Sequence, residues 1–159
     1  MNAITPNLWF DGDAEEAAAF YVSLFPDSRI DAVHRSPADN PSTRKGEVLF
    51  VEFTLAGQPF AGINGGPQYR FTEAVSFSID CADQAEVDRY WEALTADGGQ
   101  EVACGWCKDR FGLSWQVVPR RLGELLSSSD RAAAERAMQA MMKMIKLDVA
   151  VLEAAAKGD

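Results

Sequence analysis

Hydrophobic and polar residues follow the same order twice along the chain. An apolar run over residues 8–10 leads into an acidic segment and then into an amphipathic stretch over 14–25. The same order returns where residues 75–79 lead into a stretch over 85–94. An Asp-x-x-Glu capping box precedes each amphipathic stretch, Asp13 with Glu16 and Asp83 with Glu86. Self-similarity at this long period predicts a duplicated supersecondary unit, and we expect the function at the surface between the two copies.

The periodicity also predicts the individual elements of each copy. In the first copy we expect a helix over 14–25 and strands over 3–10, 29–35, 48–56 and 59–64. In the second copy we expect a helix over 85–94 and strands over 74–79, 100–106 and 113–118. After Pro119 the pattern is purely helical, with predicted helices over 122–126, over 130–146 and after Asp148. The expected organisation is a first module over 1–66, a second over 67–120 and a helical extension over 121–159, all within one compact domain.

Composition and charge narrow the classes of function. Apolar residues make up 47% of the chain and charged residues 25%, which is typical of a globular protein in water. The net charge of −9 and the scattered basic residues argue against binding to nucleic acid. No apolar run approaches the ~20 residues of a membrane span, and the N-terminus lacks a signal-peptide pattern, so we expect no membrane partner and a cytoplasmic location. Three cysteines, an odd number, favour reduced thiols.

Two motifs suggest other chemistry. Cys104 and Cys107 form a Cys-x-x-Cys, which is compatible with a redox pair, with half of a zinc site, or with two structural thiols on a strand. We favour the structural interpretation, because a turn and a strand follow Cys107 where a redox pair needs a helix N-terminus. The glycine-rich run over 62–66 precedes Pro67 and a polar loop, which does not fit the strand–loop–helix of a nucleotide or S-adenosylmethionine site.

Longer segments carry a family resemblance. LWFDGDAEEAAAFYVSLFPDSRI, GQPFAGINGGP and CGWCKDRFGLSWQVVP resemble the PhnB-like branch of the vicinal oxygen chelate superfamily, which includes glyoxalase, bleomycin-resistance and dioxygenase proteins. Members of this branch are often described as 3-demethylubiquinone-9 3-methyltransferase-like. The resemblance implies an α+β, glyoxalase-like fold, with two βαβββ modules that form a curved mixed sheet, plus C-terminal helices.

The resemblance also implies where a metal would bind. The superfamily holds a divalent metal with His, Glu or Gln side chains, and those positions fall here at Pro6 or Asn7, Ala61, Ala74 and Gln116. Only Asn7 and Gln116 keep an oxygen ligand, and both side chains are neutral. The one histidine, His34, lies on a different predicted strand. We therefore expect no metal site and no cofactor.

Aromatic and polar residues on the predicted strands are the composition expected of a small-molecule pocket. The pocket candidates are Asn7, Trp9, Glu52, Asn64, Trp106, Lys108 and Gln116. The predicted function is binding of a small molecule in the concave face of the sheet, without the superfamily metal and with no catalytic residue assigned. The alternative is an enzyme, either a divergent metal-dependent lyase or dioxygenase or the methyltransferase of the family description. Exposed strand edges favour a homodimer.

Overall fold

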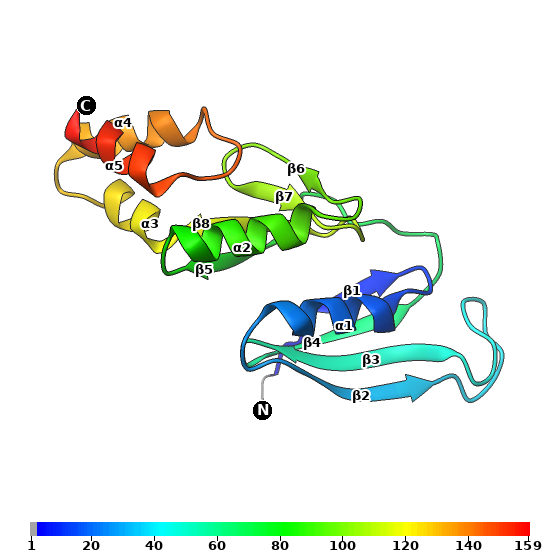
Figure 1. The fold of residues 1–159 in the computed structure, drawn as a ribbon. Coiled ribbons are helices and arrows are strands. Elements are labelled where there is room, and N and C mark those ends of the chain that lie inside the picture. The colour runs from blue at the N-terminus through cyan, green and yellow to red at the C-terminus, as the bar shows by residue number, and fades with distance from the viewer. Residues whose placement is uncertain (1–2) are drawn as a thin grey trace. The chain divides into compact units, whose positions relative to one another are not determined.

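The computed structural model describes residues 3–159, and the chain divides into two compact units, 1–71 and 72–159. Each unit contains a four-stranded mixed sheet with one helix packed on it, and the second unit ends in further helices (Figure 1). The predicted α+β class, with two βαβββ modules and C-terminal helices, is confirmed.

In the N-terminal unit, the sheet has the order β1-β4-β3-β2, with β1 parallel to β4 and the other neighbours antiparallel. Its elements are β1 (Asn7–Phe10), α1 (Ala14–Leu24), β2 (Arg29–Arg35), β3 (Val48–Leu55) and β4 (Gln58–Asn64). Helix α1 buries Ala14, Ala18 and Tyr21, and the ring centroids of Tyr21 and Phe53 lie 6.4 Å apart. Alternation along β3 therefore turns Phe53 toward α1 and Glu52 toward the opposite, open face.

The C-terminal unit repeats this arrangement with the sheet order β5-β8-β7-β6 and β5 parallel to β8. Its elements are β5 (Ser76–Cys81), α2 (Gln84–Thr95), β6 (Gln100–Glu101), β7 (Trp106–Lys108) and β8 (Ser114–Pro119). Helix α2 buries Val87, Tyr90, Trp91 and Leu94. Trp115 and Val117 of β8 are buried, and the residues between them in sequence face the open side of the sheet.

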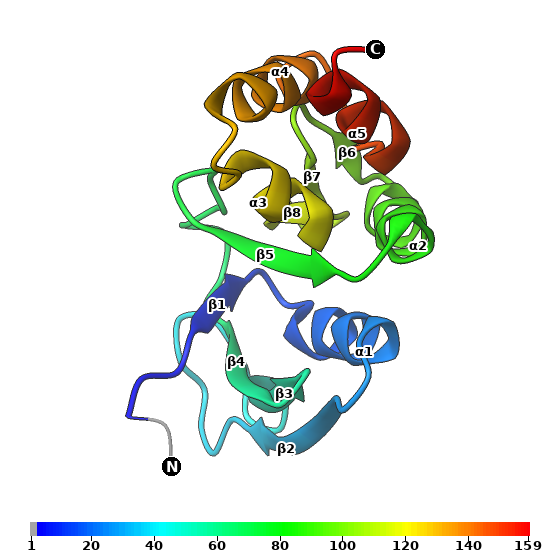
Figure 2. The same ribbon diagram turned by 90° about the vertical axis from the view of Figure 1, so that its left-hand side faces the viewer.

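Three helices follow the second sheet, α3 (Arg120–Leu126), α4 (Arg131–Met141) and α5 (Val149–Lys157), and they pack against one another (Figure 2). Their core contains Leu122, Leu125, Ala137, Leu147 and Leu152. No helix among residues 3–159 is long and apolar enough to cross a membrane.

Two predicted elements, the strand over 100–106 and the helix over 130–146, were wrong for a shared reason. The strand is split into β6 and β7, with Cys104 and Gly105 at positive φ between them (59° and 82°). The helix ends at Met141, because the backbone beyond it bonds to this turn: Cys104 N–H donates to Met144 O and Gly105 N–H to Ile145 O, both at 2.8 Å. The predicted strand over 3–10 is also shorter, starting at Asn7, since Pro6 has no N–H to donate.

The two predicted capping boxes differ. Asp83 accepts a hydrogen bond from Glu86 N, and the Glu86 carboxylate accepts one from Ala82 N, so this box is formed. Asp13 makes no capping hydrogen bond with its side chain. At the start of α1, Ala14 N–H instead donates to the Asn64 side-chain oxygen at 3.0 Å. The first helix is thus capped by a residue of β4, which is far away in sequence.

Candidate functional site

The face of the N-terminal sheet that α1 leaves open contains a hollow of about 550 Å³. All four strands contribute to it, since residues in cross-strand register point to the same face of a sheet. The hollow is lined by Thr5, Asn7, Arg29, Asp31, Ala32, Phe50, Glu52, Phe53, Thr54, Pro59, Phe60 and Ala61. Its middle row runs from Asn7 on β1 through Ala61 on β4 to Glu52 on β3. Two of the predicted pocket residues, Asn7 and Glu52, therefore lie in one hollow.

Charged side chains on β2 and β3 give the hollow its polarity. The Glu52 carboxylate lies 2.7 Å from His34 Nε2, and the Asp31 carboxylate lies 2.7 Å from Arg29 Nε. Thr54 donates its hydroxyl proton to Asp31 at 2.6 Å. Two carboxylates and one guanidinium thus line the hollow, beside the aromatic ring of Phe50. The rings of Phe53 and Phe60 stack on each other on the α1 side of the sheet. This lining favours a neutral or cationic molecule with an apolar part over an anion.

Two other predicted pocket residues of this unit have structural roles. Asn64 is buried on the α1 side of β4, where its side chain accepts from Ala14 N and donates to Val48 O. It does not line the hollow, because it follows Ile63 by one position and so points to the opposite face. Trp9 faces the open side, but its indole N–H donates to Gly66 O at 2.8 Å and its ring packs edge-on against Tyr69. A Cβ at Gly65 would collide with this ring, so the glycine is needed there for packing.

The remaining predicted residues, Trp106, Lys108 and Gln116, share the open face of the C-terminal sheet. Trp106 pairs with Gln116, which pairs with Ser78, and Lys108 pairs with Ser114, which pairs with Ser76. Gln116 donates a hydrogen bond to the Ser76 hydroxyl at 2.9 Å, and Lys108 forms an ion pair with Glu73. By alternation along β8, Ser114, Gln116 and Val118 share this face, and Val118 packs against the helical core.

The donor atoms on these faces do not fit the superfamily metal. Among residues 3–159, no group of three or more His, Cys, Asp or Glu side chains is placed to hold a metal ion. Strand β5 begins at Ser76, so the register sets Ser78 opposite Gln116, and Ala74 lies in the turn before the strand. The positions that correspond to the superfamily's metal ligands thus carry an amide at Asn7, a methyl at Ala61, a hydroxyl at Ser78 and an amide at Gln116. Neutral donors of this kind repay the dehydration of a divalent ion poorly.

Two of the three cysteines, Cys81 and Cys107, have the properties of structural thiols. Cys81 and Cys107 are buried, and burial raises the pKa of each thiol to about 12. Negative charges act in the same direction, from Glu86 and Asp80 on Cys81 and from Asp109 and Glu101 on Cys107. Redox cysteines need a lowered pKa at the attacking thiol. Cys107, on the strand β7, has the opposite property.

The glycine-rich run also serves packing. Gly62 lies within β4, where a Cβ would come 3.2 Å from the Phe10 ring and 3.4 Å from Ala14. No helix follows this run, since β5 is the next element after β4. The strand–loop–helix geometry that holds an S-adenosylmethionine or nucleotide is therefore missing at this position.

Sequence reasoning missed several polar residues on the open faces. Thr54 could have been identified from the sequence, because alternation along the strand sets it two residues beyond Glu52 on the same face. The sequence could not identify Arg29, Asp31 and Ser114, because a strand's register against its neighbour and its bulges depend on the whole sheet. The sequence analysis set His34 aside because it lies on a different predicted strand, and the β2–β3 pairing brings it to Glu52.

The comparisons with known proteins agree with this architecture. Residues 2–118 match the family described as 3-demethylubiquinone-9 3-methyltransferase. The chain belongs to this family. It is similar to the PhnB protein from Bacillus cereus, described as a 3-demethylubiquinone-9 3-methyltransferase, with 33% identity and a TM-score of 0.67. That match covers 74% of this chain and 99% of the other. No curated protein matches this PhnB-like chain significantly.

More distant solved structures share the fold of this PhnB-like chain. A Pseudomonas aeruginosa protein is 21% identical with a TM-score of 0.61, and the match covers 75% of this chain and 98% of the other. The fosfomycin resistance protein FosX from Mesorhizobium loti is 16% identical with a TM-score of 0.50, over 73% of this chain and 89% of the other. The predicted membership of the PhnB-like branch is confirmed, and the likeness to the two more distant proteins is one of fold.

Proposed function

We propose that this PhnB-like protein binds a small molecule in the hollow of its N-terminal sheet and does so without a metal ion. The observation that supports this most is the hollow itself, about 550 Å³ across four strands, with the Phe50 ring beside polar groups. The preferred ligand carries an amine or other hydrogen-bond donors together with an apolar group, because Asp31 and Glu52 outnumber Arg29 in the lining.

Amide NMR with a matched pair of probes tests the location and the charge preference. Benzylamine and benzoate share a ring, but one carries a cation and the other an anion. We expect benzylamine to shift the amide signals of residues around Glu52 and Ala61, with a dissociation constant on the order of 1 mM, which is ordinary for so small a ligand. Benzoate should leave these signals unchanged. Equal responses to both probes, or shifts scattered over other surfaces, would count against the proposal.

A single charge change in the hollow sharpens this test. Glu52→Gln should weaken benzylamine binding roughly threefold, because a half-exposed charge pair contributes less than about 1 kcal/mol. The matched control is Glu15→Gln on the exposed side of α1, which removes the same charge from a surface outside the hollow. A loss of affinity that is equal in both variants would indicate an effect of net charge only.

The family description offers methyl transfer as a second candidate. It rests on the match over residues 2–118 and on the description of the Bacillus cereus protein. Calorimetric titration with S-adenosylmethionine tests it, and micromolar binding would favour methyl transfer over the ligand-binding proposal. Elemental analysis of the purified protein tests the metal-dependent lyase or dioxygenase alternative, which stoichiometric Ni, Zn, Fe or Mn would support.

A further inference from the structure

Ser114, at the start of β8, has a buried hydroxyl group with no hydrogen-bond partner among residues 3–159. The residue is only 1% exposed. Buried hydroxyl groups in folded proteins nearly always have a partner, so an unpaired one indicates a water, an ion or a ligand group that completes it. The hydroxyl faces the open side of the C-terminal sheet, since Trp115 beside it in sequence faces α2 and is buried.

The position of Ser114 is fixed by the turn between β7 and β8. The buried carboxylate of Asp109 accepts hydrogen bonds from Phe111 N and Leu113 N and, at 2.9 Å, from Trp115 Nε1. These bonds hold the backbone before Ser114 and the side chain of the residue after it. The hydroxyl is therefore presented on a rigid element, as a binding site requires.

A cation and a second hydroxyl flank Ser114 in the same row of the sheet. Lys108 on β7 is its partner on one side, and Ser76 on β5 is its partner on the other. Gln116 donates to the Ser76 oxygen at 2.9 Å, which leaves the Ser76 hydroxyl proton available to a ligand. The row Ser76–Ser114–Lys108 thus presents two hydroxyl donors and one ammonium group.

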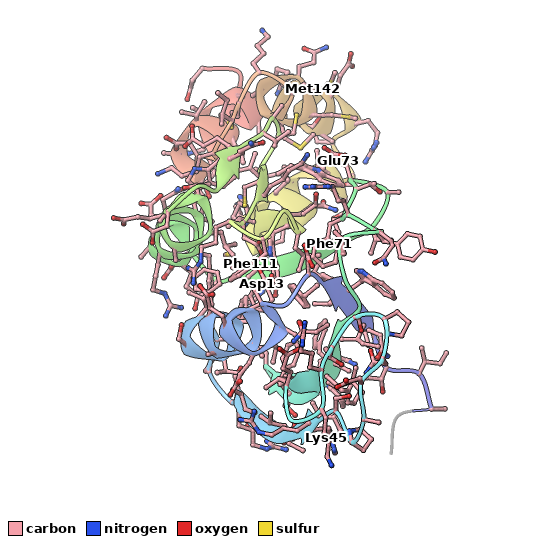
Figure 3. The ribbon with its side chains drawn as sticks, turned by 90° about the vertical axis from the view of Figure 1, so that its right-hand side faces the viewer. Asp13, Lys45, Phe71, Glu73, Phe111 and Met142 are labelled. Carbon is pink, nitrogen blue, oxygen red and sulfur yellow. The ribbon has the colours of Figure 1, made fainter. Side chains whose placement is uncertain are left out.

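A carboxylate of the chain itself already pairs with the cation of this row. Lys108 on β7 forms an ion pair with Glu73. Glu73, labelled in Figure 3, lies in the loop leading into β5. Strand β8 lies between β7 and β5, so the Lys108–Glu73 bridge crosses β8 at the level of Ser114. The ammonium group keeps the pKa of the Glu73 carboxyl below its ordinary value, chiefly through the hydrogen bond from Lys108.

We propose that the row Ser76–Ser114–Lys108 binds the oxyanion of a small molecule, a carboxylate or a phosphate group, and that Glu73 holds the site until the anion displaces it. Lys108 supplies the charge, and Ser114 and Ser76 donate hydrogen bonds to the anion's oxygens. Glu73 acts as an internal competitor of the same chemistry. This site lies in the second unit and does not depend on the hollow of the first.

Titration of the whole protein with inorganic phosphate and with acetate, followed by amide NMR at constant ionic strength in chloride, tests this site. Glu73→Gln should tighten binding of the preferred anion about tenfold, because the competing carboxylate is removed and the Lys108 charge remains. Lys108→Met should abolish saturable binding, and Ser114→Ala should weaken it about fivefold. The anion that binds more tightly shows whether the site prefers a phosphate group or a carboxylate.

Two variants control for net charge. Glu92→Gln removes an exposed charge on α2 like that of Glu73, and Lys143→Met removes an exposed charge after α4 like that of Lys108. Neither should change binding at the site. The proposal would be overturned by saturable binding of neither anion, by binding that survives Lys108→Met, or by equal gains in the Glu73→Gln and Glu92→Gln proteins. Glu52→Gln, which tests the hollow, should leave this titration unchanged, so the two proposals fail separately.

Discussion

At the scale of single residues, Asn64 shows how one side chain links a helix to a sheet. Its oxygen accepts from the first N–H of α1, and its nitrogen donates to Val48 O at 2.8 Å. Replacing it with Ala leaves both backbone groups without these partners. We expect Asn64→Ala to lower the free energy of unfolding by about 2 kcal/mol, measured by urea denaturation. Asn7→Ala, on the exposed face of the same sheet, is the control and should change it by less than about 0.5 kcal/mol.

The raised pKa values of Cys81 and Cys107 predict the reactivity of the thiols and the response to alkaline pH. At pH 8 both thiols are protonated in the folded state, so iodoacetamide should modify Cys104 and leave Cys81 and Cys107 unmodified until the protein is unfolded. The unfolded chain releases these protons near pH 9, and the folded chain near 12. The folded state therefore binds more protons in that window, and stability should fall as the pH rises from 9 toward 12. Mass spectrometry that finds all three cysteines labelled in the native protein would contradict this assignment.

The same residues show how far a sequence allows a site to be predicted. Alternation along β3 is enough to set Glu52 on the face opposite Phe53. The role of Asn64 could not be read in this way, because its side chain accepts from an N–H of α1, which lies far away in sequence. The bridge from Lys108 to Glu73 and the unpaired Ser114 were beyond prediction, since they depend on which strands lie side by side and in which register.

At the scale of elements, helix α5 depends on a side chain from α4. Arg136 donates to Ala155 O and Ala156 O, at 3.0 and 2.6 Å, and so satisfies carbonyl groups in the last turn of α5. Arg136→Met keeps much of the apolar stem and removes both bonds. Amide hydrogen exchange over residues 152–157 should become about tenfold faster, which corresponds to about 1.4 kcal/mol. Lys143→Met is the control, and equal acceleration in both variants would mean that the Arg136 bonds do not stabilise α5.

Helices and strands with a clear period were predicted well, and the failures lie where backbone groups bond across the chain. The C-terminal half of the predicted helix over 130–146 keeps a helical pattern, yet the carbonyls of Met144 and Ile145 accept from the turn at Cys104 and Gly105. A local pattern contains no information about such distant partners, so tertiary bonding overrides it.

At the scale of the whole molecule, the predicted homodimer agrees with the apolar surface that one chain leaves exposed. Met138, Met142 and Ile145 are each exposed by half or more, and β2 is an edge strand. Light scattering after size exclusion should give twice the 17.4 kDa mass of one chain at micromolar concentration. A clean monomer under these conditions would contradict the prediction.

The central claim is that the hollow binds its ligand without the divalent metal of the superfamily. The most direct test is the dissociation constant of benzylamine, measured by amide NMR with protein treated with EDTA and again with protein supplied with excess Mg²⁺. Because no group of three or more His, Cys, Asp or Glu side chains among residues 3–159 is placed to hold a metal ion, we predict the same constant in both conditions, with shifts centred on Glu52. Binding around Glu52 only when the metal is present would contradict the account.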